Sequence, residues 1–379
     1  MSALQPFKAI FPSKKLVNKI LFQLDSPVTS RKLLPLYESI YNTGRLPPGP
    51  AKDLNSNTLF VMYKVLERAR KTTQFEYPEV RKIREYCLTE SAVRGSNDAI
   101  ALLCQQIMLT PEGSEAVSME KKQRASRLLK ELVSIGHPLS FKVVGDLMSA
   151  KRWGTSGGNR AEDWYLKYLE CDEYAIGNEL RGEVLEKLGE IEMKKQDLSE
   201  RDLKLAESRF LEAIRITNPK ERARSFYYLA QIYIRYDPLK SEILLEQACS
   251  QGLKEGFKEI GHLEKNYFKN VEKAREWFRI GMELFDIECF FGYFDCCYAL
   301  KDYKNAYNTL ESLKGMVKRD EGYRETVKAF VAYRLDKIST LSDKVSEIAV
   351  VGRSEKQLDT ENKTPKNMAT KNEDSRWDF

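Results

Sequence analysis

Thiol and imidazole side chains are the groups in this chain that could bind a metal or supply a nucleophile and its base. The chain has seven cysteines and only two histidines, His137 and His262. A structural zinc site needs about four closely spaced thiolate or imidazole ligands, and no Cys-x-x-Cys pair occurs. Scattered cysteines in an odd number are expected to be reduced, buried small residues. The sequence therefore predicts no metal and no cofactor.

A catalytic set of serine or cysteine with histidine would need one of the two histidines beside a nucleophile. His262 occupies the polar position of a repeated motif described below, where contact with a ligand and simple exposure to solvent are both open. The glycine-rich segment 154–158 lacks the Gly-Lys-Ser/Thr ending of a phosphate-binding loop, and no strand is expected before it. It is predicted to be a loop between helices. We therefore predict that the protein is not an enzyme and takes no small-molecule substrate.

The composition favours a helical, globular protein. Of 379 residues, 42% are hydrophobic and 31% charged, with only 20 glycines and 13 prolines. That balance provides a sizeable core and favours helix over sheet. A net charge of +6 is mild for this length and gives no support to nucleic-acid binding, although it does not exclude it. No apolar run approaches the ~20 residues of a membrane-spanning helix.

The elements that would position any binding residue are indicated by a short repeated motif. Its pattern is an apolar residue, then glycine or alanine, then a polar or aromatic residue, then an apolar one. The five copies begin at residues 144, 188, 229, 260 and 291, so the starts lie 44, 41, 31 and 31 residues apart. After each copy comes a small residue followed by a bulky one, in the segments 161–165, 206–210, 241–245, 274–278 and 306–310. An earlier unit is suggested by residues 95–103 with 125–129.

This spacing has a physical cause in paired helices. A small residue allows two helix axes to approach within about 8 Å, and the large residue fills the space beside it. One hairpin cannot bury its own apolar face, so hairpins stack into a superhelix with a concave wall. We predict an all-α, right-handed solenoid of helical hairpins of the tetratricopeptide or Sel1-like kind, with a disordered C-terminal tail.

Composition changes along the chain suggest four segments. They are a basic targeting segment or first helix (1–24), an N-terminal helical region (25–90), the solenoid (91–340) and a tail (350–379) that has too few apolar residues to fold. The first 24 residues contain four lysines and no acid, and their apolar residues fall on one helical face. Such a segment resembles a mitochondrial presequence. The sequence favours an ordinary first helix over a targeting segment, since the absence of arginine before Arg31 counts against targeting.

Helix geometry also predicts which side chains face the concave wall. The predicted peptide-binding groove consists of Arg224, Tyr227, Gln231, Lys258, His262, Lys265 and Tyr293. By the same rule an earlier unit would contribute Glu183, Glu186 and Glu190. Such a wall suits an extended polar peptide, but solvated helix faces have the same composition, and both interpretations stay open. Tyr293 lies in the aromatic stretch 288–298, which is expected to be a buried central helix or, alternatively, to present an aromatic anchor.

Taken together, several segments resemble a fungal family of mitochondrial inner-membrane factors that help export the C-terminal tail of cytochrome c oxidase subunit 2. The segments are 11–25, 97–100, 145–147, 187–191 and, most distinctively, 288–297, and the resemblance runs from about Phe11 to about Leu335. The last units also resemble Sel1-like repeats, through residues 272–278 and the glycines before a first helix, Gly177 and Gly252.

The resemblance implies a non-enzymatic chaperone or adaptor on the matrix side of the mitochondrial inner membrane, peripheral rather than spanning. Its partners would be newly made subunit 2, which it stabilises, and an Oxa1-type insertase that moves the C-terminal domain of subunit 2 across the membrane. Two other functions are open from the residues alone: a mitochondrial RNA-binding helical repeat protein in translation, and a cytosolic Sel1-like scaffold. The irregular repeat spacing and the acidic third unit argue against the RNA-binding function.

Overall fold

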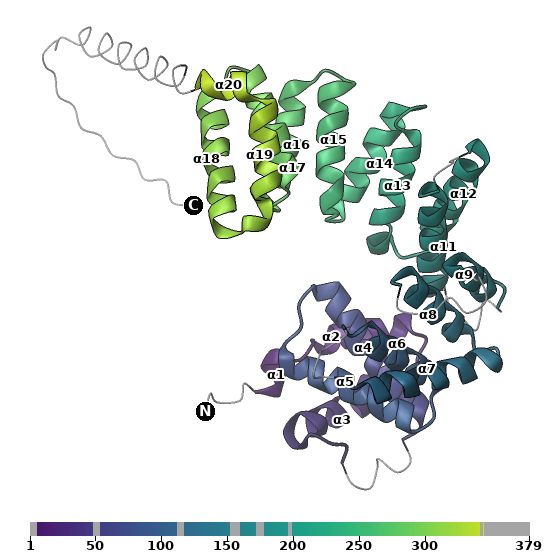
Figure 1. Cartoon of the computed structure of the whole chain (residues 1–379). Helices are drawn as coiled ribbons and strands as arrows, with labels where there is room; N and C mark the ends of the chain where they lie inside the picture. Colours follow the sequence, from purple (N-terminus) through teal and green to yellow (C-terminus); the bar gives the residue numbers. More distant parts are fainter. Residues whose placement is uncertain are drawn as a thin grey trace, which may run out of the picture. The chain divides into compact units, whose positions relative to one another are not determined.

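The structure, a computed structural model, describes residues 6–47, 54–111, 117–151, 160–171, 178–195, 199–341 and 344. Every regular element among these residues is helical (Figure 1), which confirms the predicted all-α repeat of helical hairpins. The chain forms two compact units, residues 1–198 and 199–379, and each is described by itself. The predicted disordered tail (350–379) and the glycine-rich loop (154–158) lie outside the described residues.

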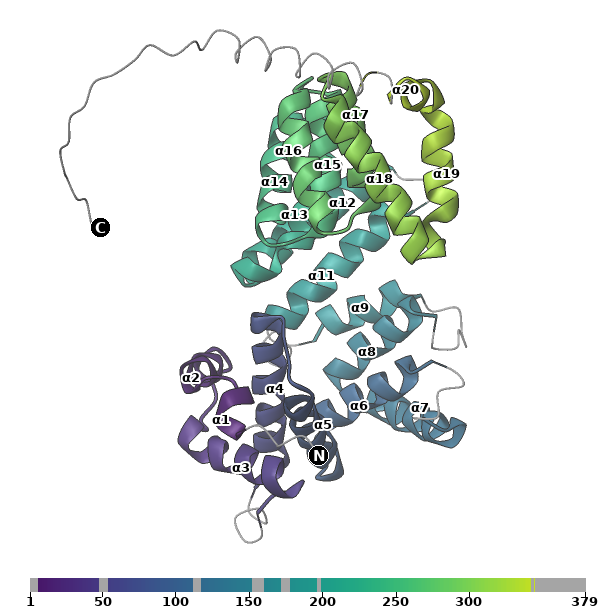
Figure 2. The ribbon, with the colours of Figure 1, turned by 90° about the vertical axis from the view of Figure 1, so that its left-hand side faces the viewer.

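The first unit is built from helices of 4 to 18 residues. Within it, α2 packs beside α4 (Figure 2). Its helices are α1 (Phe7–Ile10), α2 (Lys14–Gln23), α3 (Ser30–Thr43), α4 (Ser56–Thr73), α5 (Pro78–Val93), α6 (Asn97–Leu109), α7 (Met119–Ser134), α8 (Pro138–Ser149), α9 (Ala161–Leu169) and α11 (Asn178–Met193). In each of the hairpins α4/α5, α6/α7 and α8/α9, two helices that follow one another in sequence pack against each other. The suggested early repeat unit at residues 95–129 is therefore the α6/α7 hairpin.

The N-terminal segment contributes a packed helix to this unit. In α2, Val17, Ile20 and Leu21 are buried in the same apolar cluster as Leu33 and Leu59, while the lysines of the helix face solvent. Residues 14–23 thus have the amphipathic pattern of a helix that packs by one face. A targeting role for its basic face stays a prediction.

The apolar core and the division into compact units can be set beside the four predicted segments. The apolar cluster that begins at Ile10 continues through Leu88 to Ala99, so the core is not interrupted near residue 90. The division into compact units falls instead between Leu198 and Ser199, inside the predicted solenoid 91–340. Hydrophobic periodicity marks helices but does not show which helices share a core, and the four segments stay predictions.

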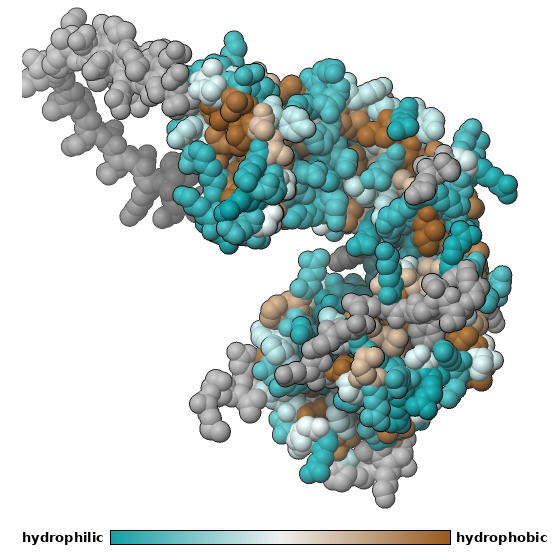
Figure 3. All heavy atoms as spheres, in the orientation of Figure 1, coloured by the Kyte–Doolittle hydropathy of each residue, from teal (hydrophilic) through white to brown (hydrophobic). Residues whose placement is uncertain are grey.

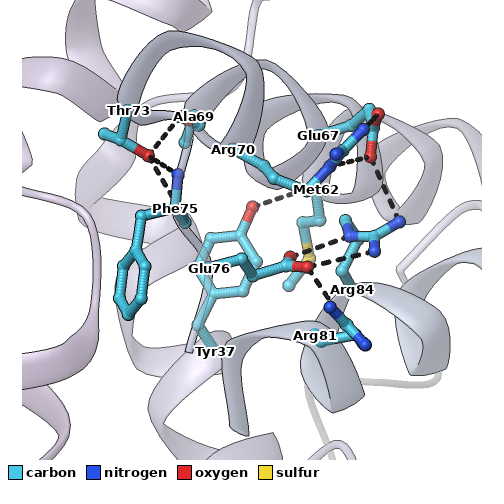
Figure 4. A network of polar contacts seen from close by, with 10 residues as sticks. All are labelled: Tyr37, Met62, Glu67, Ala69, Arg70, Thr73, Phe75, Glu76, Arg81 and Arg84. Carbon is cyan, nitrogen blue, oxygen red and sulfur yellow. Dashed lines mark hydrogen bonds and ion pairs between the residues drawn. The ribbon is translucent and has the colours of Figure 1, made fainter. Parts of the chain in front are cut away.

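A polar network closes the α4/α5 hairpin of the first unit (Figure 4). The guanidinium of Arg84 donates to Glu76 at 2.9 and 3.1 Å and lies 3.1 Å from Glu67, which also pairs with Arg70. The Glu76 side chain is only 4% exposed, so its charge must be compensated inside the protein. Beneath this network, the Tyr37 hydroxyl donates to the Met62 carbonyl at 2.8 Å and ties α3 to α4.

The second unit is a run of antiparallel hairpins followed by a short terminal pair (Figure 1). Its helices are α12 (Glu200–Ile216), α13 (Ala223–Tyr233), α14 (Pro238–Ser250), α15 (Lys254–Asn266), α16 (Val271–Glu283), α17 (Ile287–Ala299), α18 (Tyr303–Arg319), α19 (Arg324–Tyr333) and α20 (Leu335–Ser339), with short 3₁₀ turns before α13 and α19. We call α13, α15 and α17 first helices, and their partners α14, α16 and α18 second helices.

Each second helix begins at an acidic or amide cap. The side chains of Asp237, Asn270 and Asp302 accept hydrogen bonds from backbone N–H groups three residues further on, at 3.0, 3.0 and 3.3 Å. These caps satisfy N–H groups that have no partner within the helix. The turn from first to second helix is therefore encoded locally in each hairpin.

Three glycines of the repeated motif, Gly145, Gly261 and Gly292, lie where helices pack closely, as predicted. A Cβ placed on Gly145 would lie 2.6 Å from the ring of Tyr165, and one placed on Gly261 would lie 2.6 Å from the ring of Phe278. Gly292 also packs on Phe278, with a corresponding distance of 2.5 Å. The motif therefore pairs a glycine with a large ring on the facing helix, and both rings are fully buried.

Two first helices of the second unit, α15 and α17, lie closer together than the second helices beside them. Helix α15 packs directly on α17, whereas no comparable contact joins α13 to α15, α14 to α16 or α16 to α18 among the residues that the structure describes. A stack with one layer closer together curves toward that layer. We refer to the solvent side of α13, α15 and α17 as the inner face.

Candidate functional site

The inner face of the second unit is the candidate site, because all seven residues predicted for a peptide-binding groove lie on its three helices. Three of them (Arg224, Tyr227 and Gln231) belong to α13, three (Lys258, His262 and Lys265) to α15, and Tyr293 to α17. Arg224 is exposed and the other six are half-buried. The site is thus made of side chains from consecutive hairpins.

Two ion pairs connect α15 to α17 across this face. The Lys258 ammonium lies 2.9 Å from the Glu288 carboxylate, and the Lys265 ammonium lies 3.3 Å from that of Asp295. In both pairs the acid stands 30 residues after the lysine, close to the 31-residue repeat. The predicted groove residues Lys258 and Lys265 therefore belong to a row of paired charges rather than to a surface of one sign.

Asp295 is the centre of a cluster of charges that extends the second ion pair. Its carboxylate accepts two hydrogen bonds from Arg334, at 2.9 and 2.7 Å, and Lys337 lies 3.5 Å away. Burial alone would raise the pKa of Asp295, but the Arg334 hydrogen bonds and the charges of Lys265, Arg334 and Lys337 outweigh burial and lower it. The ionised Asp295 therefore holds α15, α17 and the end of α19 together.

His262 lies between the two ion pairs as a neutral ring. Its imidazole meets the Phe278 ring edge-on, with centroids 5.1 Å apart. Burial lowers the pKa of His262, and the positive charges of Lys265 and Lys258 lower it further, so the imidazole is uncharged at neutral pH. A neutral imidazole can both donate and accept a hydrogen bond, which suits contact with a peptide backbone.

Tyr227 and Gln231 form a polar pair on the preceding hairpin. The Tyr227 hydroxyl interacts with the side chains of Gln231 and of Glu259 on α15. Burial, followed by the charge of Glu259, raises the pKa of Tyr227 to about 12, so the phenol stays protonated. This position corresponds to Lys258 one hairpin later, and in both cases the side chain reaches toward acids of the next first helix.

Tyr293 is not brought together with the two lysines. It stands two residues before Asp295, and at 100° per residue the two side chains leave α17 on nearly opposite sides. Tyr293 packs among residues of α16 to α18, and its hydroxyl lies near Cys297, Arg275 and Asp302. The residue after the motif glycine is His262 in α15 and Tyr293 in α17. These two residues face different neighbours, because Gly292 packs against Phe278 of the preceding hairpin.

The acidic residues predicted for an earlier stretch of the wall are also paired. Glu183 lies 3.0 Å from Lys142 and 3.3 Å from Lys187, and Glu190 pairs with Lys194. Glu186, Glu183 and Glu190 belong to α11 of the first unit. These acidic residues therefore belong to a different unit from the inner face.

Sequence reasoning missed four members of the inner-face network: Glu288, Asp295, Arg334 and Lys337. A signal for the first two was present, since an acid follows Lys258 and Lys265 at nearly one repeat length. No comparable signal pointed to Arg334 or Lys337, because α19 and α20 carry no copy of the motif.

Six of the seven cysteines are buried, and Cys171 is half-buried. All seven cysteines are free, and burial raises the pKa of Cys249 and of Cys289 to about 12, so these thiols stay protonated. Among the described residues no group of three or more His, Cys, Asp or Glu side chains could hold a metal ion. Nor does any described helix combine the length and hydrophobicity that crossing a membrane requires.

Comparison with known proteins gives one match to the N-terminal part of the chain and one to most of its length. The MSS2 N-terminal domain family matches residues 3–96. The mitochondrial protein MSS2 of Saccharomyces cerevisiae is 33% identical over 341 residues, which cover 88% of this chain and 94% of the yeast protein. A solved structure of pilF from Pseudomonas aeruginosa matches 62% of this chain and 99% of its own, with 16% identity and a TM-score of 0.43. On the extent and identity of the yeast match, the chain belongs to the MSS2 family.

Proposed function

We propose that this protein is a non-enzymatic chaperone that binds newly made cytochrome c oxidase subunit 2 on the matrix side of the mitochondrial inner membrane. It stabilises subunit 2 and assists translocation of its C-terminal domain together with an Oxa1-type insertase. The protein is associated with the membrane peripherally. Membership in a family with a mitochondrial yeast member supports the compartment.

The observation that carries the binding role is the row of paired charges on the inner face. Lys258 is 24% exposed and its partner Glu288 is 53% exposed, so water screens this pair. Exposed ion pairs contribute only about 0–1 kcal/mol. A client with charged and polar side chains can therefore replace such a pair at little cost, with Tyr227 and His262 supplying hydrogen bonds beside it.

This arrangement suits an extended polypeptide better than RNA. The carboxylates of Glu288 and Asp295 stand among the basic residues and would repel a phosphate backbone. Half-buried tyrosine and neutral histidine, in contrast, are amphipathic groups that contact peptide backbone and side chains equally well. A client with mixed charge fits this surface.

A binding measurement with purified full-length protein tests the proposal. The probe is the soluble C-terminal domain of subunit 2, labelled and followed by fluorescence anisotropy. Lys258→Gln should raise the dissociation constant about 3- to 10-fold, as expected for loss of one charged contact. Glutamine is preferred to glutamate, which would be repelled by Glu288.

The matched control is Lys314→Gln, because Lys314 lies on second helix α18 and is also paired with an acid, Glu311. It should leave binding unchanged. If both substitutions raise the dissociation constant equally, the inner face is not the binding surface. Displacement of the labelled domain by single-stranded RNA at lower concentration than by unlabelled domain would favour the RNA-binding function instead.

A further inference from the structure

The turns that lead from a first helix to its second helix all lie on one edge of the second unit. Because the hairpins are antiparallel, these turns share one side, and the turn after α19 lies on it too (Figure 1). We call this surface the turn edge and define it as residues 234–240, 266–272, 300–305 and 333–337. The opposite edge consists of residues 217–223, 250–255, 283–288 and 319–325.

Large apolar and aromatic side chains of the turn edge stand in solvent. Tyr236 is 68% exposed, Leu239 63%, Tyr267 59%, Tyr333 87% and Leu335 61%. Figure 3 shows apolar surface over the α19–α20 end. Exposed large side chains that recur along one edge in three of its four turns indicate a surface with a partner.

The same edge is basic. Arg235, Lys269, Lys301 and Lys304 are exposed, and none of them has an ion-pair partner within the described part of the chain. In sequence the turn edge has seven basic and four acidic residues, whereas the opposite edge has five basic and eight acidic ones. The two edges of one unit thus differ in sign.

We propose that the turn edge is the surface by which this protein lies on an anionic lipid bilayer. Tyrosine and leucine side chains partition into the headgroup region, where an aromatic ring finds apolar and polar surroundings at once. Lysine and arginine beside them are attracted to acidic headgroups. The turns form a row, so their side chains can meet a flat surface together. The inference rests on the proposed membrane-associated function and assigns the surface that performs it.

A lipid surface accounts for this edge better than a nucleic acid does. Unpaired lysines alone would suit phosphates of either kind. Exposed aliphatic side chains such as Leu239 and Leu335 gain nothing from a sugar–phosphate backbone, but they lose water-exposed area in a bilayer interface. The combination of aliphatic, aromatic and basic side chains therefore favours a lipid surface over a nucleic acid.

Co-sedimentation of the full-length protein with vesicles tests the inference. The vesicles contain phosphatidylcholine with about one-fifth cardiolipin, or phosphatidylcholine alone. The wild-type protein should bind the anionic vesicles only. The triple variant Lys269→Glu/Lys301→Glu/Lys304→Glu should reduce the partition coefficient at least about 50-fold, since each cation near such a surface contributes about one kcal/mol. Tyr236→Ser/Tyr267→Ser should also reduce it.

The control lies on the opposite edge. Phe285 is 68% exposed there, and Phe285→Ser combined with Lys254→Glu makes the same kinds of change. This control should bind vesicles like the wild type, and thermal unfolding should confirm that all variants fold. Equal loss in both edges' variants, no loss in either, or preference of the wild type for RNA over anionic vesicles would overturn the inference.

Failure of this inference can be told apart from failure of the proposed function. The turn-edge variants should still bind the soluble domain of subunit 2, because the substituted residues lie outside the inner face. If the domain binds but vesicles do not, the membrane surface is wrong and the chaperone function stands. If vesicles bind as expected and the domain does not, the client is wrong and the membrane surface stands.

Discussion

The ring of Phe278 fills the space that a side chain on Gly261 would need: an added Cβ would lie 2.6 Å from the Phe278 Cε1. Gly292 of the next first helix lies against the same ring, so one phenylalanine of α16 packs between two glycines. Both glycines belong to copies of the repeated motif. The recurring glycine is therefore a requirement of helix packing in this part of the stack.

Gly261→Ala should destabilise the second unit. The new methyl group meets the face of a fully buried ring that has no space to move into, and overpacking of this kind costs about 1–3 kcal/mol. The midpoint of urea unfolding, followed by circular dichroism, measures the effect. Gly315→Ala is the control, because nothing lies within 4 Å of its added Cβ. In α18 this change should stabilise by about 0.5–1 kcal/mol, and similar behaviour of the two variants would contradict the packing described.

Asp295→Asn should loosen the end of the stack. The substitution keeps the shape but removes the charge on which Lys265, Arg334 and Lys337 converge, at a side chain only 13% exposed. Loss of a largely buried charged partner costs about 1–3 kcal/mol. Hydrogen exchange should increase in α19 and α20 more than in α13 and α14. Glu325→Gln, which removes an exposed pair with Lys328, should change nothing measurable, and a uniform response along the unit would be inconsistent with Asp295 as a local tie.

Stability should fall as the pH drops from about 6.5 to about 5, in part because of His262. Its pKa in the folded protein lies below the ordinary value of 6.5, since the ring is buried and near two lysines. The unfolded chain therefore binds the proton first, so His262 stabilises fully above pH 6.5 and loses that contribution as the pH falls. Thermal unfolding of wild type and His262→Gln at pH 7.5, 6.5 and 5.5 tests this. The variant should show the shallower decline, and parallel curves would mean that His262 does not titrate as described.

The fold was predictable because its signals are local. The spacing of 31 residues between Gly261 and Gly292 predicted hairpins, and cap residues such as Asp302 mark where helices begin. A small residue and a ring on the facing helix are needed wherever axes approach closely, so the pattern reports the physical contact directly. The pairing of Gly145 with Tyr165 confirms that the inference holds in the first unit too.

The site was predictable only in part, because side-chain neighbours depend on packing between repeats. Lys258 and Lys265 lie together on α15, but their acidic partners one repeat later were not recognised from the sequence. Tyr293 was assigned by position in the motif, and the packing of Gly292 against a ring of the preceding hairpin turns that position elsewhere. Arg334 could not be found at all from the motif, since the helix that carries it is not a copy of the repeat.

The central claim is that the inner face of the second unit contacts a nascent mitochondrial polypeptide. A photo-reactive amino acid at Gln231, with a control at Lys314 on second helix α18, tests it in isolated mitochondria that are synthesising labelled proteins. Illumination should trap one labelled chain, cytochrome c oxidase subunit 2, from position 231 and none from position 314. Trapping of RNA, of many unrelated chains, or of the same products from both positions would contradict the account.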